Sequence, residues 1–362
     1  MSRNSFVQRL IPQWVLDGAA YQVADASGMV KLDAMENPYV WPTELRQSLA
    51  ARLAETQLNR YPDPQAAALR QPLRDWMRIP ESLEVLFGNG SDEIIALVIS
   101  ALIGSGRAVC APDPSFVMFS VLARHYQVPF CPLPLDMAHD IDVLAWQQAL
   151  NSVDAGVVFV PQPNNPTGNL FSKDRLKAVV EGTDALVVID EAYTAFTDAD
   201  YLHWAADFPN VVVMRTLSKV GLAGSRFGLL IGDPQWIDQF DKLRLPYNIN
   251  VLSQTAVQFA LEHADVLERQ SAAIREERTR LTDALRTRGI TVWHSEANFL
   301  VAVMPAGQAH AVFSGLKELG VLVKCLDGSH PMLTDALRVT VGTPEESDAF
   351  LAALDQLVGG GR

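Results

Sequence analysis

The sequence predicts an α/β protein with a large domain, built on a mostly parallel mixed sheet between helices, and a smaller α+β domain. Short valine-rich runs alternate with longer helical ones, and most of these runs are apolar at every position, as in strands buried on both faces. Strand, helix and strand repeated in this way favour a layered fold with a largely parallel sheet. After about residue 250 the pattern changes to a long charged helical stretch followed by further strands.

The expected elements of the first part are seven strands with helices between them. The strands lie at 83–88, 108–112, 127–134, 155–161, 185–190, 211–215 and 227–232, and two of the helices at 91–103 and 172–182. The stretch 253–289 has no proline and reaches its first glycine at Gly289, so it is one long helix or two joined by a bend. Strands at 298–304 and 336–342 with a helix at 309–320 complete the smaller domain.

Composition excludes several classes of protein. The chain has 362 residues and a net charge of −13, which disfavours a non-specific partner such as nucleic acid or an anionic membrane. No apolar run approaches the roughly 20 residues of a membrane span, and the N-terminus lacks the apolar core of a signal peptide, so we expect a cytoplasmic protein. The scattered Cys110, Cys131 and Cys325 are expected to be packing residues, with no disulfide framework and no metal site.

Polar residues follow the expected strands, where open α/β sheets bind ligands. After 83–88 comes a glycine turn with Ser91 as a candidate helix N-cap, and the N–H groups of Ser91, Asp92 and Glu93 could bind an anion. The acidic residues could equally be ordinary first-turn complements to the helix dipole. The loop "QPNNPTGN" (162–169) follows another strand and could direct an amide into a crevice, or be a simple surface turn.

Charged residues at the ends of two further strands are more unusual. Asp190 ends a buried strand, with Tyr193 three residues later, and a carboxylate there needs a cation, a proton or a helix to cap. In "TLSKVGLAGSRFG" (216–228), Lys219 follows the apolar run "VVVM", where desolvation is expensive unless the lysine has a use; an exposed turn is the alternative.

Pyridoxal 5′-phosphate is the ligand that needs this whole set. Its phosphate needs an anion site with Ser218 and Arg226, and its ring nitrogen needs a carboxylate so that the ring can withdraw electrons. Its phenolate oxygen takes donors from an amide and a tyrosine, and its aldehyde needs a lysine.

In this order and spacing, "PNNPTG", "DEAY" and "SK…R.G" resemble fold-type I pyridoxal-phosphate aminotransferases of the aspartate aminotransferase superfamily. More narrowly, "KLDAMENPY" (31–39), "LNRYPD" (58–63), "GSDEII" (90–95), "PSFVMFS" (114–120) and "LRVTVGTPEE" (337–346) resemble histidinol-phosphate aminotransferases. The resemblance runs from about residue 20 to about 346, and it implies an N-terminal arm over 1–30, a large cofactor-binding domain over 40–250, and a small domain formed by 31–39 with 251–362.

The resemblance also implies roles for particular residues. Lys219 would form the Schiff base and move the proton of the 1,3-shift, Asp190 would pair with the pyridine nitrogen, and Tyr193 would complete the catalytic group. The other implied cofactor contacts are Asn165 with Tyr193 at the 3′ oxygen, Phe116 on the ring, and Ser91, Asp92, Glu93, Ser218 and Arg226 around the phosphate, with Tyr61 reaching the cofactor of a neighbouring subunit in a homodimer. The implied substrate residues are Arg338, which matches an arginine for a carboxylate or phosphate, and Tyr21, Asn37 and Lys324.

Three positions depart from the family pattern. Phe116 stands where relatives usually carry tyrosine, and Lys324 where an arginine often assists in phosphate binding. Arg226 comes seven residues after Lys219, where many relatives have eight, and Gly221 and Gly224 could absorb the shortening.

The implied activity is a ping-pong transamination between L-histidinol phosphate and 2-oxoglutarate. An aromatic amino-acid aminotransferase is the nearest alternative, and a decarboxylase of threonine phosphate is a more distant one. A cofactor-binding regulator without turnover would need an appended DNA-binding segment, for which the roughly 30 residues before the domain leave no room. A nicotinamide dehydrogenase is disfavoured because no G-x-G-x-x-G follows the first strand.

Overall fold

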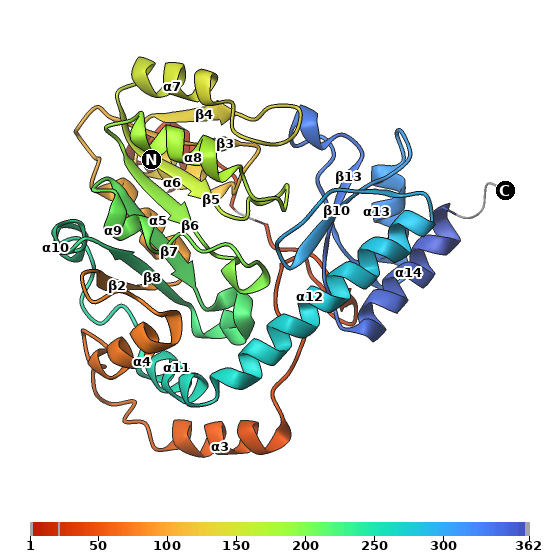
Figure 1. Ribbon diagram of the computed structural model, residues 1–362, viewed down its shortest axis with the longest axis horizontal. Coiled ribbons are helices and arrows are strands. Elements are labelled where there is room, and N and C mark those ends of the chain that lie inside the picture. The colour runs from red at the N-terminus through yellow and green to blue at the C-terminus, as the bar shows by residue number, and fades with distance from the viewer. Residues whose placement is uncertain (1–2, 21, 359–362) are drawn as a thin grey trace.

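The computed structural model describes residues 3–20 and 22–358 and confirms the predicted α/β class (Figure 1). Its centre is a seven-stranded sheet in the order β2-β8-β7-β6-β5-β3-β4. Only β8 runs antiparallel to its neighbours, so the sheet is mixed but mostly parallel. The strands are β2 (Glu84–Asn89), β3 (Ala108–Asp113), β4 (Phe130–Pro134), β5 (Ala155–Pro161), β6 (Leu186–Asp190), β7 (Val211–Thr216) and β8 (Phe227–Gly232).

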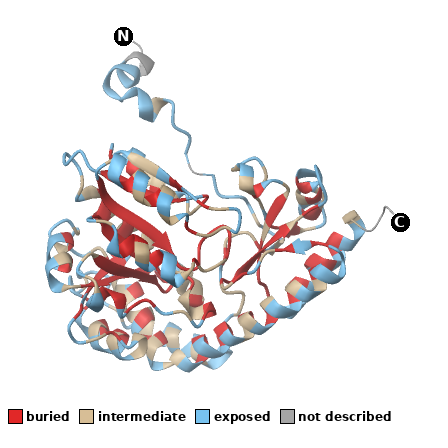
Figure 2. Cartoon of the chain, turned by 45° about the horizontal axis from the view of Figure 1, so that its top comes forward, coloured by how far each residue is buried: buried red, intermediate tan, exposed pale blue. Residues whose placement is uncertain are grey.

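Helices cover both faces of this sheet, which explains the continuous apolar runs in its strands. Along β5, Val158 and Val160 join the apolar cluster on one face, and Val157 and Phe159 join the cluster on the other. The first cluster includes residues of α4 (Ala67–Met77), α7 (Val143–Ser152), α8 (Lys173–Glu181), α9 (Trp204–Asp207) and α11 (Val251–Glu262). The second includes residues of α5 (Ser91–Ser100), α6 (Met118–His125) and α10 (Pro234–Asp241). Figure 2 shows the strands as a buried layer between these helices.

The C-terminal part has its own antiparallel sheet in the order β12-β13-β10-β9. Its strands are β9 (Thr291–Val292), β10 (Phe299–Val303), β12 (Lys324–Cys325) and β13 (Ala336–Thr340), accompanied by α13 (Ala309–Glu318) and α14 (Pro344–Val358). Residues 30–31 form β1 (Val30–Lys31), which pairs in parallel with β11 (Val321–Leu322), and Leu32 and Met35 join the apolar cluster of this part.

The long helical stretch is two helices, which was one of the two expected forms. α11 ends at Glu262 and α12 (Ala264–Thr287) begins after His263, whose backbone is not helical. α11 packs on α3 (Thr43–Ala54) and α4, while α12 runs from the large sheet to the smaller one (Figure 1). The division into domains at particular residues stays a prediction.

The first residues contain two helices that the sequence did not predict, α1 (Arg3–Leu10) and α2 (Gln13–Leu16). Both expose apolar residues such as Leu10 and Trp14, although the ring of Trp14 lies 6.2 Å from that of His125 in α6 (Figure 2). Within 3–20 and 22–358, every helix is too short or too polar to cross a membrane.

Candidate active site

A cavity of about 100 Å³ lies at the carboxyl ends of the parallel strands, next to Lys219. Nine residues that the sequence predicted line it: Ser91, Asp92, Phe116, Asn165, Asp190, Tyr193, Ser218, Lys219 and Arg226. They come from the segments after β2, β3, β5, β6 and β7, so chain segments more than 100 residues apart meet at one edge of the sheet.

Lys219 follows the last residue of β7 by three positions. Its Nζ donates to the carbonyl oxygen of Ala34 at 3.4 Å and lies 5.8 Å from the centre of the Tyr193 ring. Burial, and then the positive charge of Arg338, lower the pKa of Lys219 to about 8. Much of the lysine is therefore neutral at slightly alkaline pH, when its amine can act as a nucleophile or a base.

Asp190 is the last residue of β6 and is 5% exposed. Its carboxylate accepts one hydrogen bond, from the N–H of Ala192 at 3.0 Å. Burial raises the pKa of Asp190 to about 7. A cation beside this carboxylate would restore its ionised form.

The anion site at the start of α5 differs from the prediction in one detail. Gly90, not Ser91, is the N-cap, and its φ of 82° lies in the region that favours glycine. A Cβ at Gly90 would lie 2.6 Å from Nη2 of Arg226, and a Cβ at Gly228 would lie 2.7 Å from the backbone carbon of Gly90. Both glycines are therefore needed where β8 and the arginine approach the start of the helix.

Side chains around this helix start hold one another. Arg226 donates to Ser218 Oγ at 3.4 Å and pairs with Asp92 at 3.2 Å. Thr216 donates to Ser218 Oγ at 3.0 Å. Glu93 does not line the cavity, because its carboxylate accepts from the N–H of Asn89 and the side chain of Asn248.

A second cavity, of about 430 Å³, adjoins the first and shares Met35, Phe116 and Asn165 with it. Arg338 and Lys324 line it, and they are direct partners in the antiparallel pairing of β13 with β12. Arg338 donates to Asn165 Oδ1 at 2.7 Å and to the carbonyl oxygen of Asp33 at 2.9 Å. Two cations therefore lie side by side at the wall of the larger cavity.

Three predicted residues lie elsewhere. The amide of Asn37 donates to the carbonyl oxygen of Val220 and to Gln270, each at 3.0 Å, so it anchors the segment after Lys219 and lines neither cavity. Tyr61 is 81% exposed, stacks on Tyr247 with 4.5 Å between ring centres, and lines a separate groove. Tyr21 lies outside the described residues.

Met35 is a site residue that the sequence analysis missed. It is 8% exposed, lines both cavities, and its sulfur accepts from the hydroxyl of Tyr193 at 3.2 Å. Burial also raises the pKa of the Tyr193 phenol, so its O–H stays protonated. A methionine carries no chemical signal in a sequence, although Met35 lies within the motif 31–39 that carried the resemblance.

This fold, with a desolvated lysine and a buried carboxylate at adjacent strand ends, is that of fold-type I pyridoxal-phosphate enzymes. The sequence matches the family of class I and II aminotransferases over residues 27–354, and the chain belongs to that family.

Relatives and solved structures agree with this assignment. Histidinol-phosphate aminotransferase 2 of Nitrosococcus oceani is 46% identical over 349 residues, covering 95% of this chain and 97% of the relative. Histidinol-phosphate aminotransferase 1 of Burkholderia lata is 47% identical, covering 96% and 97%. The crystal structure of histidinol-phosphate aminotransferase from Sinorhizobium meliloti in complex with pyridoxal-5′-phosphate has a TM-score of 0.82 at 23% identity, covering 91% of each chain, which supports the fold.

Proposed function

We propose that this chain transfers the amino group of L-histidinol phosphate to 2-oxoglutarate, giving imidazole-acetol phosphate and glutamate, with pyridoxal 5′-phosphate as its cofactor. The observation that carries the proposal is the pair of cations, Lys324 and Arg338, in the cavity that adjoins Lys219 and Asp190. The two relatives named as histidinol-phosphate aminotransferases support the choice of substrate.

The residues present fit the cofactor. The N-terminal end of α5, with Ser91, Asp92 and the guanidinium of Arg226, suits a phosphate. The lack of side chains at Gly90 and Gly228 lets Arg226 and β8 lie close to this end of the helix. The carboxylate of Asp190 has no cation bonded to it among the described residues, which suits a protonated ring nitrogen. We assign Phe116 to the ring face, and Asn165 with Tyr193 to the 3′ oxygen.

When bound, the cofactor supplies an aldehyde that bonds to an amine and a pyridine ring that withdraws electrons from the neighbouring carbon. Lys219 would hold the cofactor through that aldehyde, and its Nζ would take the proton from the substrate Cα. A pKa of about 8 suits this work, because the amine is then neutral in a useful fraction of molecules and its conjugate acid can still return a proton. Asp190, in its ionised form, keeps the ring nitrogen protonated.

The substrate end lies in the larger cavity. Arg338 presents a planar fork for two oxygen atoms, and Lys324 adds a point charge beside it. A phosphate in one half-reaction and a carboxylate in the other can use the same pair, which is what a ping-pong mechanism with one site requires.

We propose a homodimer on the position of Tyr61. In the single chain, Tyr61 is exposed and does not line the cavity of Lys219, although the resemblance assigns it to a cofactor phosphate. We infer that it reaches the cofactor of the partner subunit. A protein that sediments as a monomer at full activity would remove this role.

The test is a single-turnover comparison of substrates on the holoenzyme. Mixing with L-histidinol phosphate should bleach the visible band of the bound cofactor faster, and at lower concentration, than mixing with phenylalanine. Lys324→Gln should raise the concentration of histidinol phosphate needed for half-maximal rate by about tenfold, as for the loss of a charged hydrogen bond.

A faster response to phenylalanine would overturn the substrate and favour an aromatic amino-acid aminotransferase, with the cofactor and Lys219 retained. Release of carbon dioxide from threonine phosphate would favour the decarboxylase alternative.

A further inference from the structure

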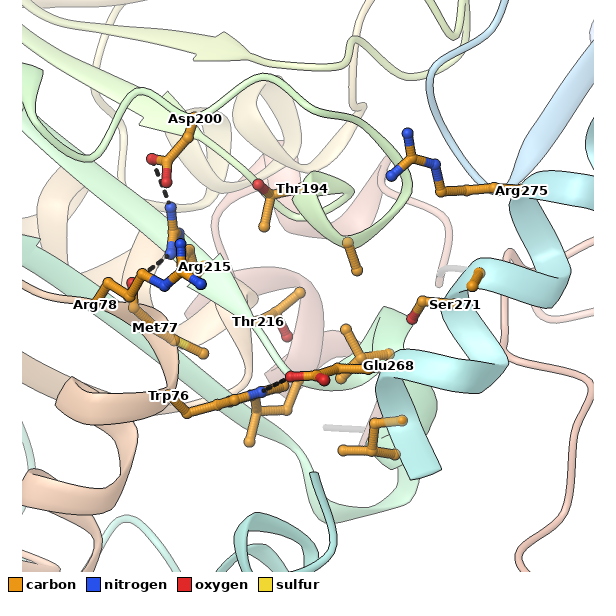
Figure 3. A pocket seen from close by; sticks show the side chains of 15 residues that line it. Trp76, Met77, Arg78, Thr194, Asp200, Arg215, Thr216, Glu268, Ser271 and Arg275 are labelled. Atoms are coloured by element: carbon orange, nitrogen blue, oxygen red, sulfur yellow. Dashed lines mark hydrogen bonds and ion pairs between the residues drawn. The ribbon is translucent and has the colours of Figure 1, made fainter. Parts of the chain in front are cut away.

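A third cavity, of about 400 Å³, lies behind the segment that carries Lys219 (Figure 3). The C-terminal end of α4, the end of β7, the 3-10 turn at Thr194–Phe196 and the first half of α12 enclose it. Its volume lies in the range of about 300–1,000 Å³ that is common for small-molecule sites. Thr216 lines both this cavity and that of Lys219, and the other residues of the two cavities differ.

One part of its wall is apolar and one aromatic ring is fixed in place. The apolar side chains are those of Met77, Leu217, Val220 and Leu267. The indole N–H of Trp76 donates to Glu268 Oε1 at 3.0 Å, which ties the end of α4 to α12 across the cavity. A ring held in this way offers a flat surface for another flat group at a small entropic cost.

Two polar side chains in the wall have no partner among residues 3–20 and 22–358, and they differ in burial. Ser271 is 5% exposed, and its hydroxyl oxygen is buried without a hydrogen bond. A buried hydroxyl without a partner is destabilising. Arg78 is exposed, and its guanidinium makes no hydrogen bond or ion pair within the part of the chain that the structure describes.

Arg78 also has a backbone that its side chain does not favour. Its φ of 55° puts it in the left-handed region at the C-cap of α4, where glycine is the usual residue. Such conformations in non-glycine residues concentrate at ligand sites. The backbone conformation and the unpaired guanidinium therefore both favour a ligand site at Arg78.

Most of the other charged groups of the wall form ion pairs. Arg215 bonds to Glu191 at 2.7 Å and to Asp200 at 3.0 Å, and Arg275 pairs with Asp198 at 2.8 Å. Glu268 accepts a hydrogen bond from the neutral indole of Trp76 and forms no ion pair among the described residues. Arg78 is the cation of this wall that forms no ion pair within the described part of the chain.

We propose that this cavity binds a small organic carboxylate with a flat apolar body. The fork of Arg78 would hold the carboxylate, and the ring of Trp76 would cover the flat body. This site is separate from the substrate cavity that Arg338 and Lys324 line, and it does not depend on the proposed substrate.

The shared wall gives this site a route to the cofactor. Thr216 bonds to Ser218, and Ser218 accepts from Arg226, which we assign to the cofactor phosphate. A ligand that shifts Thr216 would change the affinity for the cofactor, and linkage requires that the cofactor change the affinity for the ligand by the same factor.

The test is a titration of the holoenzyme with phenylacetate in which ligand-observed NMR monitors binding. A ligand of this size should bind with a Kd on the order of 1 mM. 2-Phenylethanol, which keeps the ring and lacks the carboxylate, should bind at least about tenfold more weakly than phenylacetate. Arg78→Gln should weaken phenylacetate by about tenfold, and Trp76→Leu by a smaller factor.

Two control variants locate the binding. Arg269→Gln removes an exposed arginine of α12 that pairs with Asp265 and does not line the cavity, and it should leave the Kd unchanged. Arg338→Gln, in the substrate cavity, should also leave it unchanged. No binding by the unaltered protein would overturn the proposal, as would binding that Arg338→Gln abolishes and Arg78→Gln does not.

The route through Thr216 has its own measurement. The cofactor's dissociation constant, followed by its visible absorbance, should change by about twofold or more when phenylacetate is saturating. A cofactor affinity that is the same with and without bound phenylacetate would overturn the coupling.

Discussion

Two acidic residues next to each other in the sequence behave in opposite ways. Asp190 and Glu191 end the same strand segment and are 5% and 1% exposed. Glu191 bonds to Arg215 at 2.7 Å and accepts from the N–H of Tyr201 at 2.6 Å, whereas Asp190 accepts, among the described residues, only from the N–H of Ala192. The chain thus supplies a cation to one carboxylate and leaves the other for a ligand.

The two cations show the same contrast. Arg215 is held by two carboxylates, while the ammonium of Lys219 has one carbonyl oxygen at 3.4 Å. A buried ion pair serves structure when its charges are matched, and removing one partner leaves an uncompensated charge. Burial shifts the pKa values of Asp190 and Lys219 with no bonded ion to oppose the shift, whereas Arg215 opposes the rise in pKa that burial causes at Glu191. This difference separates Asp190 and Lys219, which we assign to catalysis, from Glu191 and Arg215, which stabilise the structure.

Removing the amine of Lys219 should have the largest effect on activity. Lys219→Ala removes both the amine that bonds to the cofactor and the group that moves the proton, so turnover should fall by about 10⁴-fold or more. Steady-state transamination measures this, with far-UV circular dichroism as the check on folding. Turnover at a normal rate would show that Lys219 is not the catalytic lysine.

Removing the supporting cation should act on stability instead. Arg215→Met leaves Glu191 buried without its partner, which should lower the free energy of unfolding by about 3–5 kcal/mol. Arg269→Met, at an exposed pair, should cost less than about 1 kcal/mol. Urea denaturation of both variants measures the difference; equal losses would contradict the structural role of the buried pair.

Neutralising the carboxylate of Asp190 should raise the free energy of unfolding of the apoprotein, whereas Arg215→Met lowers it. Burial raises the folded-state pKa of Asp190 from 3.8 to about 7, so the folded apoprotein binds the extra proton between these values and loses stability as pH rises through that window. Asp190→Asn removes this pH dependence. The free energy of unfolding of the apoprotein variant, relative to that of the unaltered apoprotein, should therefore rise by about 1.4 kcal/mol per pH unit from about pH 4 to pH 7.

Denaturation of both apoproteins at several pH values measures this slope, and a difference that does not vary with pH would contradict it. In the holoenzyme the same substitution should slow turnover by about 10²-fold or more, because the ring nitrogen loses the carboxylate that keeps it protonated.

Much of the fold could be predicted because burial on both faces leaves a local mark. The seven strands of the large sheet were expected within a few residues, since most of them are continuous apolar runs. The two-residue strands β1, β9, β11 and β12 were not, because so short a segment has no periodicity. Helices α1 and α2 were missed because their apolar residues are exposed, without a periodic buried face in this chain.

The chemical groups at the strand ends can be read from the sequence, because Asp190, Lys219 and Arg226 lie at the ends of recognisable strands or in the segments after them. Which charges are paired and which side chains meet depends on the three-dimensional packing. Lys324 lies beside Arg338 through strand pairing, Met35 reaches Tyr193 across 158 positions, and Arg78 and Ser271 line one cavity. Such contacts depend on how distant elements pack, and no local pattern of residues encodes them.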